Sequence, residues 1–493
     1  MSFFSTRGGA CVTASQAILY GLAENGGLYV PAMFPHISYE NIVEMVGMDY
    51  EKRAVSILKY FLEDFSLSEI EQAVAGAYGG GKFDDAKIAP LNMLDGRTAV
   101  LELFHGPTLA FKDMALQLLP HLTTLAAKKN AEENEIAILV ATSGDTGKAA
   151  LEGFKDVPGT SCTVFYPKNG VSHVQEMQMT TTGGDNTHVI SVEGNFDDAQ
   201  TGVKALFSSE KFQAEMAAMG KRLSSANSIN FGRLAPQIVY YFSAYADLLK
   251  THQIGMGDKV NFVVPTGNFG NILAAYYAMQ MGLPVGRLIC ASNHNNVLSD
   301  FFNSGIYSTH RTFMKTTSPS MDILVSSNLE RLLFELCERD GDLVSVWMNL
   351  LNESGSYSIG EQRLEEIRKT FTGDFANDRE TAWHIKTVYE RYRYVMDPHT
   401  AVAGHVLNRY REETGDSTLS VIVSTASPFK FSDDVLRALG ADFTPDTAAR
   451  KLAELTSLDV PKQVAELENL PVRHFETCEK NHMAEAVIKS FSK

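Results

Sequence analysis

The chain has few cysteines and no excess of positive charge, and each shortage excludes a class of protein. The five cysteines are odd in number, widely spaced and form no C-x-x-C pair: Cys11, Cys162, Cys290, Cys337 and Cys478. This spacing argues against a disulfide framework or a cysteine zinc site. The formal net charge of −16 provides no electrostatic footprint for nucleic acid or an anionic membrane. Any anion must therefore be bound by local groups, such as a helix N-terminus or a single arginine.

The sequence also lacks the signals of export, membrane insertion, metal binding and serine hydrolysis. The N-terminal MSFFSTRGGACVTASQ has no basic start followed by an apolar run, so we expect a cytosolic protein. No apolar stretch is long enough to span a bilayer. His399 and His405 are spaced poorly for one helical face and there is no H-E-x-x-H motif, so we expect no metal site. No serine lies in a G-x-S-x-G elbow.

What is present is a typical globular composition, with 44% hydrophobic and 21% charged residues among 493. Three segments consist of an apolar strand, a turn and a helix, namely 135–154, 187–207 and 259–282, and 417–431 contains another buried strand. Near-continuous apolar strands that alternate with helices predict an α/β protein with parallel sheets covered on both faces. In such sheets ligands bind beyond the carboxyl ends of the strands. We predict a small, mainly helical N-terminal unit at 1–92, a first α/β unit at 93–235 and a second at 236–493 with a helical tail.

One lysine follows an apolar run. In FHGPTLAFKDMA, Lys112 comes directly after Leu109-Ala110-Phe111. A lysine that forms a Schiff base with an aldehyde must be neutral part of the time, so its pKa must fall from about 10.4. Phe104, Phe111 and Met114 could provide the apolar setting that lowers it. The alternative, which is commoner for such a stretch taken alone, is a partly buried structural lysine.

A glycine-rich turn, GNFGN at Gly267–Asn271, lies between the strand NFVVP and the helix ILAAYYAMQ. Glycines let the backbone approach a ligand, and the free N–H groups and dipole of the helix attract a phosphate. A tight turn with an ordinary helix cap is the alternative.

The motif TSGDTG, Thr142–Gly147, has the same setting. Ser143, Thr146 and the backbone could bind a carboxylate or phosphate, and an ordinary N-cap is the alternative. The motif does not have the spacing of a P-loop. GAYGGGKF has that spacing, but Phe83 stands where serine or threonine must bind magnesium, so we exclude a nucleoside triphosphatase.

Two further motifs offer polar groups. In NSINFGR, Ser228, Asn230 and Arg233 provide hydroxyl, amide and guanidinium donors, and Arg233 could bind a phosphate through two hydrogen bonds. A surface ion pair explains Arg233 equally well. In STASPFKF, Thr425 offers a hydroxyl at the end of a buried strand, where a plain turn is the usual explanation.

Together these motifs resemble the threonine synthase family, which uses pyridoxal phosphate and has the tryptophan-synthase β-like fold. The resemblance rests on motifs in the family's order: STRGG with GLAENGGLYVP, FHGPTLAFKDMALQ, VATSGDTGKAA, NSINFGRLAPQIVYYF, PTGNFGNILAAYYA, DPHTAVA and STASPFKF. Seven motifs in order make chance implausible. The resemblance implies two doubly wound parallel-sheet units and conversion of O-phospho-L-homoserine and water to L-threonine and phosphate.

The resemblance also implies roles for residues. Lys112 would carry the cofactor as a Schiff base, and Thr425 would bond its pyridine nitrogen. The cofactor phosphate would be held by Gly267, Asn268, Phe269, Gly270 and Asn271. The substrate would be bound by Thr108, Ser143, Asp145, Thr146, Ser228, Asn230 and Arg233, with the first helix start suited to its carboxylate and the arginine to its phosphate. Roles for His105, Asp113 and His399 stay open between substrate contact and scaffold.

Several alternatives remain open at this point. Threonine dehydratases and cysteine synthases share the fold but usually carry asparagine where this chain has Asp145. A phospho-lyase would release phosphate without forming threonine, and a metabolite-binding protein would have lost the catalytic set. The expected partner is a small-molecule substrate, with no nucleic acid or membrane, and both a monomer and a homodimer are plausible.

Overall fold

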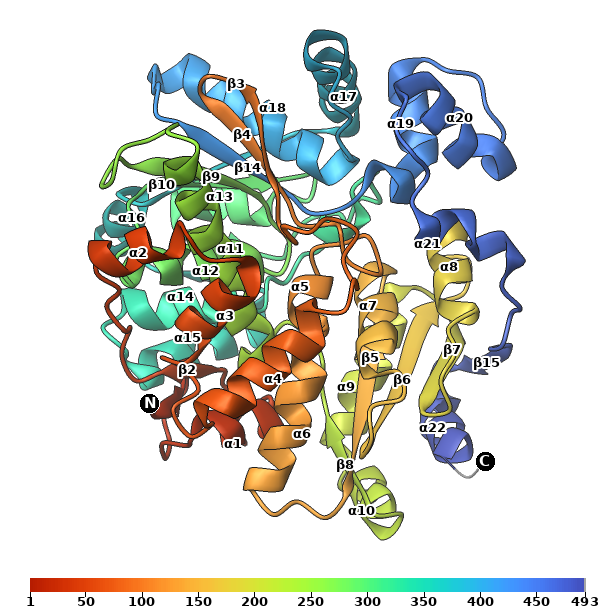
Figure 1. Ribbon diagram of the computed structural model, residues 1–493. Coiled ribbons are helices and arrows are strands. Elements are labelled where there is room, and N and C mark those ends of the chain that lie inside the picture. Colours follow the sequence, from red (N-terminus) through yellow and green to blue (C-terminus); the bar gives the residue numbers. More distant parts are fainter. Residues whose placement is uncertain (492–493) are drawn as a thin grey trace.

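The computed structural model describes residues 1–491 and contains two mainly parallel sheets side by side (Figure 1). The first has five strands in the order β15-β7-β6-β5-β8, all parallel. Its strands are β5 (Glu135–Ala141), β6 (Thr160–Pro167), β7 (Thr187–Glu193), β8 (Lys221–Ser224) and β15 (Glu476–Glu479). Its helices are α6 (Leu119–Lys129), α7 (Asp145–Phe154), α8 (His173–Thr180), α9 (Phe196–Ser208), α10 (Glu210–Ala218) and α22 (Met483–Phe491).

The second sheet has six strands in the order β13-β10-β9-β14-β4-β3, parallel except for the β3–β4 hairpin. Its strands are β3 (Leu91–Asp95), β4 (Thr98–Glu102), β9 (Val260–Pro265), β10 (Val285–Ser292), β13 (Phe371–Phe375) and β14 (Ser420–Ser424). The helices here are α11 (Phe231–Lys250), α12 (Gly270–Gln280), α13 (Val297–Ser304), α14 (Leu329–Leu336), α15 (Gly341–Ser354), α16 (Glu361–Arg368), α17 (Asp378–Tyr392) and α18 (Pro398–Thr414). A separate two-stranded antiparallel sheet pairs β11 (Ile306–Ser308) with β12 (Ser356–Ser358).

The N-terminal region is mainly helical, with α1 (Ala14–Tyr20), α2 (Tyr39–Met45), α3 (Tyr50–Leu58) and α4 (Leu67–Tyr78) beside the short pair β1 (Phe3–Ser5) and β2 (Tyr29–Pro31). These helices pack against α6 and α11 (Figure 1). Helix α11 is buried along almost its whole length and contacts α3, α5 (Asp113–Leu116) and α12, so it joins the N-terminal region to both sheets. The remaining helices, α19 (Ser432–Leu439), α20 (Ala448–Thr456) and α21 (Lys462–Ala465), lie in the C-terminal part.

The α/β class and the parallel sheets are confirmed, but the sheets do not follow the boundaries 92/93 and 235/236. Strand β4, from the segment assigned to the first unit, pairs with β14 of the second sheet, and helix α11 runs unbroken through 235/236. The C-terminal tail is not purely helical, because β15 returns to pair with β7. Sheet membership depends on pairing between distant segments, which local sequence patterns do not reveal.

The ends of several strands meet between the two sheets. Strand β5 leads into TSGDTG and α7, β9 leads into GNFGN and α12, and β14 leads into Thr425. The amide of Leu103, just after β4, donates to the Ser424 carbonyl. The carboxyl ends of parallel strands are where ligands bind in open α/β sheets. Among residues 1–491, no helix combines the length and apolarity needed to cross a membrane.

We predict that Gly153→Ala destabilises the fold around Lys112. A Cβ at Gly153 in α7 would lie 2.1 Å from the backbone carbonyl oxygen of Leu116 in α5, and a backbone atom cannot rotate away. Such overpacking typically costs about 1–3 kcal/mol. The unfolding midpoint in urea measures the change. Gly96→Ala, where the new Cβ meets nothing within 4 Å, is the matched control. Equal midpoints for the two variants would contradict close packing of α5 on α7.

Candidate active site

Lys112 lies just before α5 and is buried, with 9% of its surface exposed. Its Nζ is 4.9 Å from the centroid of the Phe111 ring, 3.3 Å from the Ser320 hydroxyl and 3.7 Å from an oxygen of Asp145. Burial lowers the pKa of Lys112 to about 8, helped by Lys430 and Arg233 and opposed by Asp145. The amine is therefore neutral much more often than that of an exposed lysine.

The backbone before Lys112 is tied to the end of β14. The amide of Phe111 donates to the Thr425 carbonyl at 2.8 Å, and the amide of Ser427 donates to the Leu109 carbonyl at 3.0 Å. Leu109 has a positive φ of 59°, a conformation that non-glycine residues rarely adopt without tertiary support. Thr425 and Lys112 are thus held near one another by main-chain hydrogen bonds. Of the expected apolar neighbours, Phe111 contacts the amine, whereas Phe104 stacks on His105.

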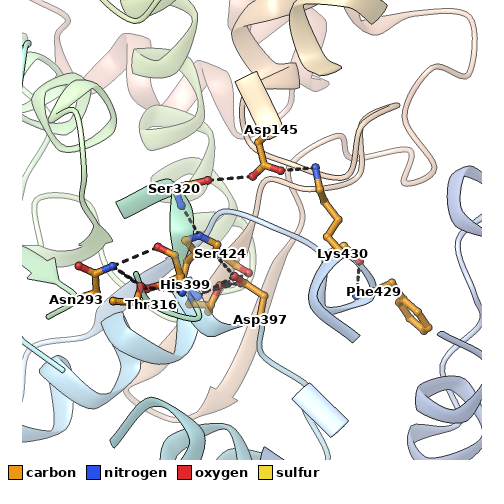
Figure 2. A network of polar contacts seen from close by, with 12 residues as sticks. Asp145, Asn293, Thr316, Ser320, Asp397, His399, Ser424, Phe429 and Lys430 are labelled. Carbon is orange, nitrogen blue, oxygen red and sulfur yellow. Dashed lines mark hydrogen bonds and ion pairs between the residues drawn. The ribbon is translucent and has the colours of Figure 1, made fainter. Parts of the chain in front are cut away.

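Asp145, the first residue of α7, is the most heavily contacted carboxylate of the site (Figure 2). It lies 2.7 Å from Nζ of Lys430 and accepts hydrogen bonds from Gln175 at 3.0 Å and Ser320 at 3.1 Å. Burial alone would raise the pKa of Asp145, but Lys430 and Lys112 hold it well below its ordinary value. Asp145 is therefore a fixed negative charge beside Lys112.

Ser320 belongs to the 3₁₀ turn η1 (Pro319–Met321), which a histidine holds in place (Figure 2). The amide of Ser320 donates to Nε2 of His399 at 3.2 Å, and Nδ1 of His399 lies 2.7 Å from Asp397. Because Nε2 accepts, the proton of the neutral ring is on Nδ1 and is donated to Asp397. His399 thus supports the turn that touches Lys112, which is a scaffold role.

The GNFGN turn lies on the other side of η1. A Cβ on Gly267 would come within 2.7 Å of the Ser320 carbonyl oxygen, so Ser320 contacts both the lysine and the turn. Phe269 adopts a left-handed φ of 64° and gives α12 no side-chain cap, which leaves the first amides of the helix free of a side-chain acceptor. The Asn271 side-chain oxygen accepts from Tyr240 and Tyr241, while its buried Nδ2 finds no hydrogen-bond partner in the part of the chain that the structure describes. Asn268 is exposed at the tip of the turn.

Arg233, in the first turn of α11, is a buried guanidinium that forms no ion pair with any carboxylate in residues 1–491. One of its terminal nitrogens donates to the Ala226 carbonyl at 2.5 Å, and its buried Nε has no hydrogen-bond partner among the described residues. Burial lowers the pKa of Arg233 to about 10, so it remains a cation near neutral pH. A buried cation without a counter-ion is costly, so Arg233 is suited to an anionic ligand.

The other residues expected to bind substrate differ in whether their side chains already form hydrogen bonds within the protein. Thr108 donates its amide and hydroxyl to Asp113, both at 2.8 Å, and Asn230 caps α11 at the Gly232 amide and donates to Ile18. The side chains of both are therefore committed to the fold. Ser143, Thr146 and Ser228 are half-buried beside these elements.

The sequence left the roles of His105 and Asp113 open, and both side chains form hydrogen bonds with residues other than Lys112. Although burial opposes it, hydrogen bonds to Asp84 and Glu102 raise the pKa of His105 to about 9. Burial raises the pKa of Asp113 to about 6, against the hydrogen bonds from Thr108. These contacts tie His105 to Asp84 and to the end of β4, and they tie Asp113 to Thr108 in the loop that carries Lys112.

Three residues of the cluster were not predicted: Lys430, Ser320 and Gln175. Lys430 lies inside the STASPFKF motif, so an apolar-flanked lysine was a signal that could have found it. Ser320 and Gln175 lie in segments without a distinctive pattern. Within the described part of the chain, no three His, Cys, Asp or Glu side chains are placed to hold a metal ion.

Comparison with known proteins defines the class. Residues 94–347 match the family model described as pyridoxal-phosphate dependent enzyme, more than half of the chain. The flanking segments identify the family within this class. Residues 2–78 match the model of the threonine synthase N terminus, and residues 400–488 match the model of the threonine synthase C-terminal region. The chain belongs to the threonine synthase family.

Comparison with individual proteins supports the same family. Threonine synthase of Pseudomonas aeruginosa is 42% identical over 89% of this chain and 90% of its own length. Threonine synthase-like 1 of Homo sapiens is 40% identical over 90% of this chain, but the chain spans only 60% of that relative. The crystal structure of threonine synthase from Brucella melitensis with bound pyridoxal phosphate matches with a TM-score of 0.89 at 38% identity, covering 100% of both chains.

The residues present fit pyridoxal phosphate. The aldehyde needs an amine that is often neutral, which Lys112 provides. The phosphate needs amide donors at a helix start, and α12 begins without a side-chain cap beside the unpartnered Nδ2 of Asn271. Ser320 touches both parts. These groups could hold the cofactor between η1 and α12.

We predict that Lys112 of cofactor-free protein is acylated with an apparent pKa near 8, whereas a free lysine titrates at about 10.4. The neutral amine is the nucleophile, so the rate rises with pH through that lower value and then levels off. Competitive labelling with acetic anhydride and peptide mass spectrometry gives the profile, and Lys211, whose side chain is 87% exposed, is the internal reference. Coincident profiles for the two lysines would contradict a desolvated Lys112.

Proposed function

We propose that the protein is a threonine synthase that converts O-phospho-L-homoserine and water to L-threonine and phosphate. The observation that carries the proposal is a buried Lys112 amine that faces Asp145, which is itself paired with Lys430. The guanidinium of Arg233, which has no carboxylate partner within residues 1–491, lowers the pKa of the Lys112 amine. Family membership supports the same reaction. A substrate with an amino group, a carboxylate and a phosphate needs an amine-exchanging lysine and separate anion sites, and the cluster offers both.

We assign the cofactor to Lys112, Gly267, Asn268, Phe269, Gly270, Asn271 and Thr425. When bound, pyridoxal phosphate supplies an electron sink for charge that develops on the amino-acid carbons. The glycine turn would present amides to its phosphate. Thr425 would offer a neutral hydroxyl to the ring nitrogen, and a hydroxyl cannot protonate that nitrogen as an aspartate would.

For the substrate, we assign the phosphate to Arg233 and Ser228, and the carboxylate to Ser143, Thr146 and the backbone amides of Asp145 and Thr146 at the start of α7. The N-cap residue of this helix is Gly144, which has no side chain, and among the described residues the Thr142 hydroxyl accepts only from the Gly144 and Gly147 amides, both at 2.9 Å. Asp145 is negative and would repel a carboxylate, so its contribution is to orient Lys112 and not to bind that group. Thr108 and Asn230 would support these sites through the backbone.

Proton transfer is assigned to Lys112. With a pKa of about 8, both of its protonation states are populated near neutral pH, as a general acid and base requires. Ser320 and Asp145 lie 3.3 and 3.7 Å from its amine, so they would keep the amine in place for proton transfer. Burial of Lys112 and Asp145 would keep bulk water away from the amine.

The deciding experiment is product analysis with O-phospho-L-homoserine. We expect threonine and phosphate in equal amounts, and loss of both with Lys112→Ala, because the other amine of the cluster, that of Lys430, is held by Asp145 and the Thr108 carbonyl. Amino-acid chromatography and a phosphate assay measure the two products. Phosphate accompanied by 2-oxobutyrate would identify a phospho-lyase, and full activity of the variant would refute the role of Lys112. Relatives named threonine synthase and threonine synthase-like 1 are similarly close, which makes this distinction necessary.

We predict that Arg233→Gln lowers kcat/KM for O-phospho-L-homoserine at least about thirtyfold, since loss of a buried charge contact costs ~2 kcal/mol or more. The loss should be mainly in KM, with the visible absorbance of the bound cofactor kept. Steady-state phosphate release measures it. Arg437→Gln, at a side chain 61% exposed, is the control and should behave like the parent. An unchanged KM would exclude Arg233 from the phosphate site.

The cytosolic location and a monomeric or homodimeric state stay predictions from the sequence. Gel filtration with light scattering would measure the oligomeric state.

A further inference from the structure

Lys430 is fully buried, with a side-chain exposure of 0%. Lysines are almost never buried to this degree unless they are paired, because removing an ammonium from water costs several kcal/mol. The Nζ of Lys430 lies 2.7 Å from Asp145 (Figure 2). It also donates to the Thr108 carbonyl at 2.9 Å. Asp145 is therefore the counter-ion that permits this burial.

The local fold directs Lys430 to this place. It lies in the 3₁₀ turn η2 (Pro428–Phe431), which follows β14, and the Ser427 hydroxyl caps this turn at the Phe429 amide. The Ser427 amide also donates to Leu109, so η2 is tied to the segment that carries Lys112. From η2 the Lys430 side chain extends to Asp145 of α7, a helix that packs on the five-stranded sheet. The ion pair thus joins the two halves of the protein.

The two oxygens of Asp145 have different partners. Oδ1 faces Lys430 and Gln175, and Oδ2 faces Ser320 and Lys112. Because Lys430 and Gln175 fix one oxygen, the other is directed at the reactive amine. The carboxylate is thereby given one orientation, which a lone aspartate at a helix start would not have.

We propose that Lys430 is a positioning residue of the active site, which holds the Asp145 carboxylate beside Lys112 and balances its negative charge. It acts through Asp145 and is not assigned a contact with substrate. The inference rests on the proposed function only in that Lys112 is the lysine that binds the cofactor.

The charged groups that face Lys112 determine in which direction each substitution should shift the pKa of Lys112. They are Asp145 from α7, Lys430 from η2 and Arg233 from α11. Besides burial, Lys430 and Arg233 lower the pKa of Lys112, whereas Asp145 raises it. Asp113 of α5 also faces Lys430. Removing Lys430 should therefore make Lys112 harder to deprotonate, and removing the charge of Asp145 should make it easier.

The test is a pH titration of the visible absorbance of cofactor bound to Lys112, on the full-length holoenzyme. We expect Lys430→Met to raise the midpoint and Asp145→Asn, which removes a carboxylate 3.7 Å from the amine, to lower it, each by about one pH unit, since a charge within a few ångströms shifts a pKa by about that much or more. The double variant should return close to the parent, because the two effects have opposite signs. Lys430→Arg keeps the charge and should keep the parent midpoint.

Lys462→Met is the matched control, since Lys462 is 80% exposed and lies in the same C-terminal part. Shifts of the same sign in both single variants, or no shift in Lys430→Met, would overturn the proposal, because a merely structural role gives no opposite signs. Should Lys430→Met fail to fold, adding it to Asp145→Asn must still raise the midpoint.

Failure of the proposed function is distinguishable from failure of this inference. A parent enzyme that binds the cofactor but makes no threonine refutes the function and leaves the titration intact. If the parent binds no cofactor, competitive acetylation of Lys112 in the same variants must show the same signs, and their absence overturns the role of Lys430.

Discussion

The site depends on one carboxylate kept out of water between two ammonium groups. Asp145 makes burial of Lys430 possible through an ion pair at 2.7 Å, and it lies 3.7 Å from Lys112. In a dry setting each of these interactions is stronger than in water, and each unpaired partner would be costly. Removing Asp145 would leave two buried cations beside Arg233. The reactivity of Lys112 and the stability of its surroundings therefore have a common origin.

This carboxylate also makes the site a property of the assembled fold. Asp145 starts α7 at the end of β5, whereas Ser320 and Lys430 come from turns beside the six-stranded sheet. Neither half contains a complete set of partners. The chain brings them together through long connections and through α11, which packs against the N-terminal helices, α5 and α12. Docking of the two halves and formation of the charge cluster are thus the same event.

The features that were predictable from the sequence are the local ones. Strand, turn and helix follow one another in TSGDTG and GNFGN, and Lys112 is recognisable by its apolar neighbours. The pairing of β4 with β14, the hydrogen bond from Ser320 and the ion pair of Lys430 join segments far apart in the chain, and no local pattern encodes them. Asn230 shows another limit, because its side-chain oxygen accepts from the Gly232 amide to cap α11 and its Nδ2 donates to Ile18, contacts that the sequence pattern does not reveal.

The choice of aspartate in the TSGDTG turn has a physical consequence. An asparagine there would be neutral and would need no counter-ion, so a buried lysine opposite it would be unfavourable. With aspartate, Lys430 becomes necessary, and the pair as a whole carries almost no net charge. Lys112 and Arg233 are then two further cations around that one carboxylate in the described part of the cluster. Such a site favours ligands with several negative charges over neutral amino acids, which is the preference that a phosphorylated amino acid requires.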